Sequence, residues 1–457
     1  MLTLRSRILT KSAASESKST SVGFISLGCA KNLVDSQIMA EALVANEIIL
    51  CAPEDADIIV VNTCSFIHDA REESMEMILS ACEQKQRGKC KAVLVAGCLP
   101  QRYRARIQEA LPDVDAFIGI DQLNKLPEIV RRLQAGQHNI IDISPQSERL
   151  FDPDDPVVFS SGVHAYLKIA EGCNHRCAFC AIPGIRGRHR SRPIDKIVDE
   201  AQKLIKRGFS ELDIISQDIT FYGHELNTNL ANLLRELGKI DGKFWLRLLY
   251  GYPTGITNEL LDVIAATPQI CNYLDIPIQH SHPDILTAML RKQTINPVIN
   301  MPEKIRSIIP DATIRTTCLV GFPGETESHF QHLLDFCKEA RFDHLGAFIY
   351  SPEEGTPAYD NDDIPPLEIA QERYSRLMQQ QQQISAEINR ELIGTSAEIL
   401  LEKQTEEKPS VWIGRTKRQA PEIDGTTTIC NLPPATAPGT FVKATITAAD
   451  NYDLQAE

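Results

Sequence analysis

The sequence lacks any apolar run that could cross a membrane. Its apolar stretches are short and are interrupted by glycine, proline or polar residues, whereas a membrane-spanning helix needs about 20 apolar residues in a row. We therefore predict that the protein has no membrane anchor and stays in solution.

The sequence also lacks the cysteine pattern of a disulfide-stabilised secreted domain. Its 13 cysteines are an odd number, and many stand in apolar surroundings instead of small loop-rich modules. The first 20 residues are basic and rich in serine, but they contain no continuous apolar segment and no clear cleavage site. Residues 1–20 are therefore predicted to be a disordered tail and not a targeting peptide. A reducing compartment, the cytoplasm, is the expected location.

Positive charge is scarce. The chain carries 47 Lys and Arg against 61 Asp and Glu, a net charge of −14. A field of this sign repels the phosphates of nucleic acid and attracts a basic partner. We expect no strong nucleic-acid binding.

A length of 457 residues predicts about three domains. Short Val- and Ile-rich runs at 22–27, 58–63 and 92–97 are typical of buried parallel strands, and helical patterns, including those at 36–46 and 72–85, separate them. Residues 21–145 are therefore predicted to form an α/β domain with a parallel sheet. Residues 146–163 are predicted to be a linker.

Six further strand patterns recur between residues 164 and 350, and their spacing leaves room for a helix after most of them. The pattern predicts a partial (βα)6 barrel, which together with a long connecting helix occupies residues 164–392. The last segment, 393–457, has short β-type runs separated by Gly and Pro turns, which predicts a small antiparallel β-barrel. Counted from residue 394, this segment has six basic and nine acidic residues, a net charge of −3.

The segment EGCNHRCAFC places Cys173, Cys177 and Cys180 in a CxxxCxxC array directly after a predicted strand. Three thiolates on one short loop can each bind one iron of a cubane cluster and leave the fourth iron open for chemistry. The alternative is a zinc site with His175 or His189 as fourth ligand, although structural zinc motifs usually pair two ligand couples.

A second set of cysteines emerges once the strands are drawn. Cys29, Cys64 and Cys98 each lie just past the carboxyl end of a predicted strand, at spacings of 35 and 34 residues. Carboxyl ends of parallel strands share one edge of a sheet, so these three distant cysteines can converge on a metal cluster. Coincidence is the alternative, because single buried cysteines are common. The other cysteines are predicted to be packing residues: Cys51, Cys82, Cys90, Cys271, Cys318, Cys337 and Cys430.

Polar and glycine residues near predicted strand ends are candidates for cofactor binding. Gln217 and Asp218 follow one strand, and Gly321 and Gly324 follow another, where a missing Cβ allows close approach of a ligand or simply a tight turn. The arginine-rich segment 186–192 either grips a carboxylate or phosphate or forms a solvated loop.

At these residues the chain resembles the radical S-adenosylmethionine (SAM) superfamily, whose hallmark is CxxxCxΦC with an aromatic Φ, here Phe179. The resemblance implies that SAM binds the open iron of a 4Fe-4S cluster on Cys173, Cys177 and Cys180 and is cleaved reductively to a 5′-deoxyadenosyl radical. The residues predicted to bind the cofactor are therefore Phe179, Gln217, Asp218, Gly321 and Gly324.

From residue 22 to residue 457 the chain is similar to the methylthiotransferase family, with cysteines in GCAKN, NTCSF and AGCLP, a radical SAM barrel and a terminal TRAM barrel. This implies a second 4Fe-4S cluster on Cys29, Cys64 and Cys98. SLGCAKNLVDS, YLDIPIQH and APEIDG resemble the branch that modifies an aspartate of ribosomal protein S12. The competing branch modifies a tRNA adenosine, and a rival from another class is a non-enzymatic electron carrier.

The resemblance implies that SAM is used twice. One molecule methylates a sulfur held on the second cluster, and another generates the radical that removes hydrogen from the aspartate β-carbon. The expected partners are S12, a basic protein, and a reductant protein such as a flavodoxin or ferredoxin.

Overall fold

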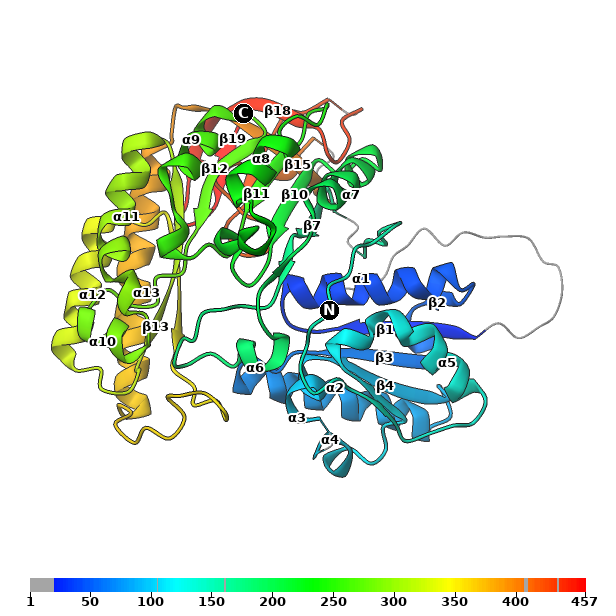
Figure 1. The fold of residues 1–457 in the computed structure, drawn as a ribbon. Coiled ribbons are helices and arrows are strands. Elements are labelled where there is room, and N and C mark those ends of the chain that lie inside the picture. The colour runs from blue at the N-terminus through cyan, green and yellow to red at the C-terminus, as the bar shows by residue number, and fades with distance from the viewer. Residues whose placement is uncertain (1–19, 105, 160–161, 407–409, 434) are drawn as a thin grey trace. The chain divides into compact units, whose positions relative to one another are not determined.

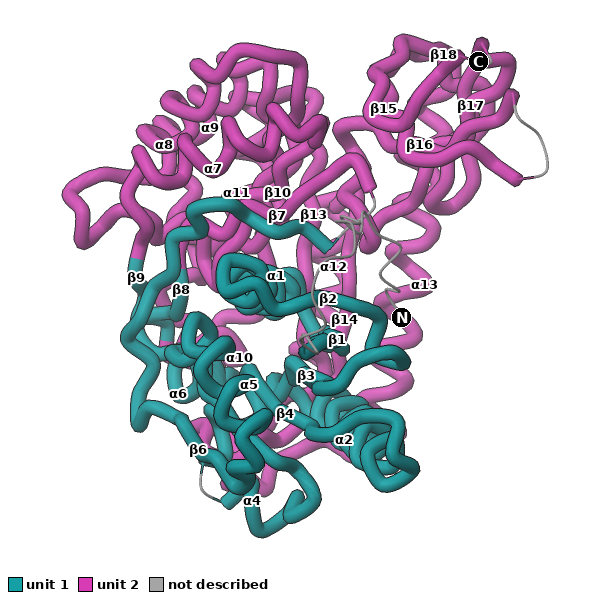
Figure 2. The backbone as a smooth tube through the Cα atoms, turned by 90° about the vertical axis from the view of Figure 1, so that its right-hand side faces the viewer, with its two compact units in different colours: residues 1–161, 171–175, 180–190 teal, residues 162–170, 176–179, 191–457 magenta. Residues whose placement is uncertain are grey.

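The computed structural model describes residues 20–104, 106–159, 162–406, 410–433 and 435–457. The predicted tail at residues 1–20 thus lies, except for Thr20, outside the described residues. The chain divides into two compact units, which are coloured separately in Figure 2 and are described here one at a time. Unit 1 contains residues 1–161, 171–175 and 180–190, and unit 2 contains residues 162–170, 176–179 and 191–457.

Unit 1 is built on a six-stranded sheet in the order β2-β1-β3-β4-β5-β6, and every pairing is parallel. The strands are β1 (Ser21–Ser26), β2 (Ile49–Cys51), β3 (Ile58–Thr63), β4 (Ala92–Gly97), β5 (Ala116–Ile118) and β6 (Ile140–Asp142). The helices are α1 (Ala30–Ala45), α2 (His68–Gln86), α3 (Cys98–Tyr103), α4 (Arg106–Ala110), α5 (Leu126–Gln134) and α6 (Ile182–Arg186). The predicted parallel α/β domain is confirmed.

The sheet of unit 1 lies between layers of helices, with α1 on one face and α2 on the other (Figure 1). Every residue of β3 and β4 is buried, as continuous runs such as IIVV and AVLV predict for central strands covered on both faces. Ile59 and Val61 pack with Val93 and Val95 against Ile78 of α2. This packing fixes the strand ends that carry the cysteines.

Unit 2 contains a six-stranded parallel sheet in the order β14-β13-β12-β11-β10-β7. Its strands are β7 (His164–Lys168), β10 (Glu211–Ile215), β11 (Trp245–Leu248), β12 (Ile270–Asp275), β13 (Thr313–Val320) and β14 (His344–Ile349). The helices are α7 (Ile194–Lys206), α8 (Leu230–Leu237), α9 (Asn258–Ala266), α10 (Pro283–Ala288), α11 (Ile295–Ile308), α12 (Glu327–Ala340) and α13 (Leu367–Glu391). The first and last strands remain edges, so the predicted partial barrel with six strands is confirmed.

The end of unit 2 is a closed five-stranded barrel in the order β15-β16-β17-β19-β18. Its strands are β15 (Ser396–Gln404), β16 (Trp412–Thr416), β17 (Thr427–Ile429), β18 (Phe441–Ala449) and β19 (Leu454–Ala456). The predicted small β-barrel is confirmed, with four antiparallel pairings and one parallel pairing, between β17 and β19. Strand directions cannot alternate all the way round a closed ring with an odd number of strands.

Among the described residues, no helix combines the length and the apolar character needed to span a membrane. The cysteines predicted to be packing residues are mostly buried, but Cys430 is exposed, so that prediction is wrong for it.

Candidate metal centre

Three of the predicted metal-ligating cysteines stand at the carboxyl ends of adjacent strands in unit 1. Cys29 comes shortly after β1 and is the N-cap of α1, Cys64 directly follows β3, and Cys98 directly follows β4. Because β1, β3 and β4 are neighbours in a parallel sheet, their carboxyl ends lie at one edge. The predicted convergence of the three strand ends is therefore present in the fold.

Two glycines let these strand ends approach closely. Gly28 and Gly97 precede Cys29 and Cys98 with φ values of 84° and 94°, a region that favours glycine. A Cβ on Gly28 would lie 2.6 Å from the Cβ of Cys64 and 3.0 Å from its Sγ. The loop that carries Cys29 is thus packed directly on Cys64.

The fully buried side chain of Asn32 ties all three strand ends together. Its Nδ2 donates hydrogen bonds to the carbonyl oxygens of Leu27 (3.0 Å) and Thr63 (2.7 Å). Its Oδ1 accepts a hydrogen bond from Cys98 Sγ at 3.5 Å. One amide therefore fixes the chain before Cys29, the chain before Cys64 and the side chain of Cys98.

A buried cation, Arg186 of α6, lies beside this group and is 1% exposed. Its Nη1 donates to both carboxylate oxygens of Glu171 at 3.1 Å. Its Nη2 donates to Asn32 Oδ1 at 2.7 Å and to Cys98 Sγ at 3.3 Å, and lies 2.9 Å from Asp35 Oδ2. A positive charge is therefore in direct contact with one of the predicted ligand sulfurs.

The three thiols differ in acidity. Burial raises the pKa of Cys98 to about 12 against the opposing effect of Arg186, and burial also raises the pKa of Cys64. Desolvation opposes ionisation of Cys29 as well, but Lys31 and Arg186 lower the pKa of Cys29 below its usual value. A thiolate is the form that binds metal, so Cys29 is the side chain of the three most ready to do so.

The predicted array of Cys173, Cys177 and Cys180 follows β8 (Ala170–Glu171), where the chain passes between the two units. Within unit 1, the Cys173 N–H donates to the carbonyl oxygen of Gly187 at 3.1 Å. A Cβ on Gly172 would lie 2.1 Å from the carbonyl oxygen of Arg188. These contacts hold the start of the cysteine loop against the chain that follows α6.

Within unit 2, a second arginine lies beside a cysteine of this array. Arg291 Nη1 is 3.7 Å from Cys177 Sγ, and its Nη2 donates to the carbonyl oxygen of Pro277 at 2.9 Å. The guanidinium also lies over the ring of Tyr252, 4.4 Å from the centroid. Both groups of cysteines thus contain a sulfur with an arginine side chain in contact.

The predicted cofactor-binding residues of unit 2 have local structural roles. Phe179 packs edge-on against Phe322, with ring centroids 6.5 Å apart. Asp218 Oδ1 accepts hydrogen bonds from the Thr220 N–H (2.9 Å) and the Thr220 hydroxyl (2.6 Å), and so caps a short helical turn. Gln217 is partly exposed.

Gly321 and Gly324 both have positive φ, at 71° and 80°. A Cβ on Gly321 would lie 2.7 Å from the Cβ of Ala370 in α13. The Gly324 N–H donates to the carbonyl oxygen of Asp363 at 2.8 Å. Turn geometry and helix packing account for both glycines.

The arginine-rich segment is not a solvated loop throughout. Arg192 is as buried as Arg186, lies 2.6 Å from Glu200 Oε2 and donates to the carbonyl oxygen of Lys168 at 2.7 Å. Arg190 Nη1 donates to backbone carbonyls, including that of Ser147 at 3.2 Å. Of the four arginines in this segment, Arg188 is the exposed one.

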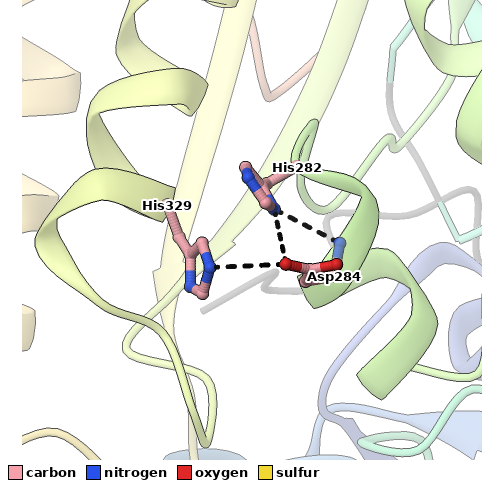
Figure 3. A group of neighbouring side chains, drawn as sticks. All are labelled: His282, Asp284 and His329. Carbon is pink, nitrogen blue, oxygen red and sulfur yellow. Dashed lines mark hydrogen bonds and ion pairs between the residues drawn. The ribbon is translucent and has the colours of Figure 1, made fainter.

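Figure 3 shows a further group of possible ligands, His282, Asp284 and His329, whose ligand atoms lie within 4.8 Å of one another. Both imidazoles act as helix caps: His282 Nδ1 accepts from the Asp284 N–H at 3.2 Å, and His329 completes a capping box with Thr326. Helix capping explains why these side chains gather here.

Sequence reasoning missed Asn32, Glu171, Arg186 as a buried cation, and Arg291. Asn32 and Glu171 stand within motifs that it singled out, GCAKN and EGC. Because the contacts of these residues form only through tertiary packing, the spacing of apolar residues in the sequence does not predict them.

Comparisons with known proteins agree with this architecture. The model of uncharacterized protein family UPF0004 matches residues 21–119, that of the radical SAM superfamily matches residues 167–337, and that of the TRAM domain matches residues 393–457.

The chain is 46% identical over 452 residues to the ribosomal protein uS12 methylthiotransferase RimO of Syntrophus aciditrophicus, covering 96% of this chain and 98% of the relative. It is 43% identical over 441 residues to the protein of the same name from Desulforamulus reducens, with 96% and 99% covered. Among solved structures, the radical SAM methyltransferase TsrM of Kitasatospora setae matches with a TM-score of 0.57 at 14% identity, over 75% of this chain and 74% of that one. The last likeness concerns the fold alone.

Proposed function

This chain belongs to the radical SAM family of ribosomal protein uS12 methylthiotransferases, and we propose that it adds a methylthio group to the β-carbon of an aspartate in uS12. The observation that carries the proposal is similarity along nearly the whole chain, 46% identity with 98% of the relative covered. The convergence of the strand ends before Cys29, Cys64 and Cys98 supports it independently.

Radical SAM membership implies SAM and a 4Fe-4S cluster, for which Cys173, Cys177 and Cys180 are the proposed ligands. Cys29, Cys64 and Cys98 are the proposed ligands of a second 4Fe-4S cluster. The residues of unit 1 fit such a group, since Gly28, the neighbour of Cys29, packs on Cys64 and Arg186 offers a cation to Cys98. When bound, the two clusters supply reductive SAM cleavage and a sulfur for transfer.

The protein's own residues prepare these sites. Asn32 and Arg186 hold the side chain of Cys98, and Arg291 lies against Cys177. Cofactor contacts are proposed for Phe179, Gln217, Asp218, Gly321 and Gly324. Gln217 and Asp218 follow the carboxyl end of β10, and Gly321 and Gly324 follow that of β13, the end of a barrel strand at which binding residues usually lie.

A radical suits this substrate because the aspartate β C–H bond is too weakly acidic for a general base that works near neutral pH. Arg188, the exposed arginine of its segment, is the proposed contact for the substrate carboxylate, since arginine binds carboxylates in a bidentate manner.

The TRAM barrel favours the protein substrate over tRNA. Lys417 donates to the carbonyl oxygen of Pro268 at 2.6 Å, and Arg418 pairs with Asp343, so both of these cations are directed at the radical SAM sheet of unit 2. A barrel with net charge −3 and basic side chains engaged in this way is a poor surface for a phosphate backbone.

The proposal also covers the location, the electron donor and the domain boundaries of the protein. We propose a cytoplasmic enzyme that takes electrons from a flavodoxin or ferredoxin. Its proposed domains are residues 21–145, 164–392 and 393–457.

The test is anaerobic reconstitution with iron and sulfide, followed by incubation with uS12, SAM and a reductant. Mass spectrometry of uS12 is expected to show the gain that corresponds to replacing one hydrogen with SCH₃, located at an aspartate. A reconstituted protein that cleaves SAM but leaves uS12 unchanged would contradict the assignment.

A further inference from the structure

We infer that Arg186 is a positioning residue for the second cluster, which donates a charge-assisted hydrogen bond to the Cys98 sulfur and thereby raises the reduction potential of that cluster. The inference rests on the proposed function, because it takes Cys98 to be a cluster ligand. It goes further by assigning the setting of the potential to one named side chain.

The first step is that Arg186 is held in place before any cluster binds. Its guanidinium contacts both oxygens of Glu171, the Oδ1 of Asn32 and a carboxylate oxygen of Asp35, at 2.7–3.1 Å. The side chain is 1% exposed. An arginine fixed on three sides by acceptors presents its remaining contact, to Cys98, in one geometry.

The second step concerns charge. An arginine side chain stays protonated in proteins, and Arg186 lies against two buried carboxylates, those of Asp35 and Glu171. Two buried carboxylates would otherwise place negative charge next to the cluster. The positive charge of Arg186 offsets these negative charges, and its Nη2 also donates a hydrogen bond to Cys98 Sγ at 3.3 Å.

The third step is the effect on the cluster. Reduction adds negative charge to an iron–sulfur cluster, and hydrogen bonds to its sulfurs stabilise the more negative state. A hydrogen bond to a charged group is worth enough to shift such an equilibrium by about tenfold. Removing Arg186 is therefore expected to make the cluster harder to reduce.

The same side chain also contacts a residue close to the other cysteine array. Glu171 stands two residues before Cys173, and the residue after Arg186, Gly187, accepts the hydrogen bond of the Cys173 N–H at 3.1 Å. Arg186 thus anchors Cys98 and the start of the CxxxCxxC loop within unit 1.

The experiment isolates the second cluster in the full-length chain by changing Cys173, Cys177 and Cys180 to Ala. In this background, reconstituted Arg186→Gln and Arg186→Lys proteins are titrated with reductant and followed by electron paramagnetic resonance. We expect Arg186→Gln to lower the midpoint potential by an amount equivalent to about a tenfold change in the ratio of reduced to oxidised cluster, or about 59 mV for one electron. Arg186→Lys, which keeps the charge, is expected to retain part of the shift.

Arg192→Gln is the matched control, because Arg192 is equally buried and paired with Glu200 but belongs to unit 2. Its potential is expected to equal that of the parent. If Arg186→Gln fails to fold, Arg186→Gln/Asp35→Asn is compared with Asp35→Asn alone, so that the carboxylate is missing from both proteins and the lower potential expected of the double variant reports the loss of Arg186. An unchanged potential in a variant that holds about four irons overturns this inference alone, whereas a parent protein without iron overturns the second cluster itself.

Discussion

At the scale of single residues, close approach of backbone decides whether the cysteines can meet. Gly97 has a φ of 94°, and a Cβ there would lie 2.2 Å from Asn62 Oδ1 and 2.8 Å from the carbonyl oxygen of Thr63. Asn62 in turn donates to the carbonyl oxygen of Asn32 at 2.7 Å. A side chain at position 97 would therefore disturb the whole set of polar contacts around Cys98.

We predict that Gly97→Ala lowers the free energy of unfolding by about 3 kcal/mol or more, because a strained φ and a steric clash add together. Gly88→Ala is the matched control, since Gly88 also has a positive φ, 71°, but nothing lies within 4 Å of its added Cβ. Gly88→Ala is expected to lower the free energy of unfolding by about 1 kcal/mol. Urea unfolding of the metal-free proteins measures both, and equal losses would show that the clash at Gly97 is relieved.

The six cysteines make a second prediction at this scale. The reconstituted protein should bind about eight irons, and changing Cys29, Cys64 and Cys98 to Ala should leave about four. That variant is expected to cleave SAM without modifying uS12. Changing any one of Cys173, Cys177 and Cys180 should abolish SAM cleavage, as measured by deoxyadenosine formation. Full iron content in the first variant would contradict the assignment of the second site.

At the scale of elements, the sequence predicted the strands better than the helix that borders the site. Runs such as IIVVNT and AVLVAG mark β3 and β4, because both faces of these strands are buried. β2, β5 and β6 have three residues each and are too short for a hydrophobic pattern. The three cysteine positions could be predicted from the strands, since topology alone brings the strand ends together.

Helix α1 shows why the rest could not be predicted. Its apolar pattern indicated a helix from residue 36, but α1 begins at Ala30. Asn32, Asp35 and Ser36 are completely buried, so the first turns of α1 turn a polar face to the interior. Prediction from periodicity assumes that the buried face of a helix is apolar. The buried face of α1 beside the candidate metal centre is polar, so the assumption fails there. The buried Arg186 escaped prediction for the same reason.

The junction between the radical SAM sheet and the TRAM barrel is also polar. Glu211 of β10 is fully buried between Arg247 of β11 and Arg415 of β16. Burial alone would raise the pKa of Glu211, but the two arginines lower it to about 2. The charged carboxylate is therefore favoured by the folded state.

This junction predicts a pH dependence of stability. Since the pKa of Glu211 is lower in the folded state, its contribution is present above the ordinary carboxyl value near 4.5 and is lost as pH falls towards 2. The loss amounts to about 3 kcal/mol in full. Urea unfolding of the metal-free protein from pH 7 to pH 3 should show wild type losing more stability than Glu211→Gln. Glu236→Gln, at a half-exposed pair with Lys239, should follow wild type, and parallel curves for all three would contradict the role of Glu211.

At the scale of the whole molecule, charge and substrate choice agree. The net charge of −14 disfavours a phosphate backbone and favours a basic ribosomal protein. Within the TRAM barrel, Lys403 and Lys443 are exposed, whereas Arg415, Lys417 and Arg418 are engaged with the radical SAM sheet. Among the barrel residues that the structure describes, so few cations are available that they can neutralise only a few phosphates.

We therefore predict that uS12 is modified in preference to tRNA when both are offered together. Reconstituted enzyme, SAM and reductant are incubated with uS12 and unmodified tRNA, and methylthio incorporation into each is measured by mass spectrometry. Incorporation is expected in uS12 alone, and its rate at limiting uS12 should fall as salt is raised from about 50 to 200 mM, because screening weakens the attraction between an acidic enzyme and a basic substrate. Reductive SAM cleavage without uS12 is the control and should change little over this range, since it requires no macromolecular encounter. Methylthio incorporation into tRNA with uS12 untouched would instead assign this chain to the tRNA-modifying branch, against the direction of its charge.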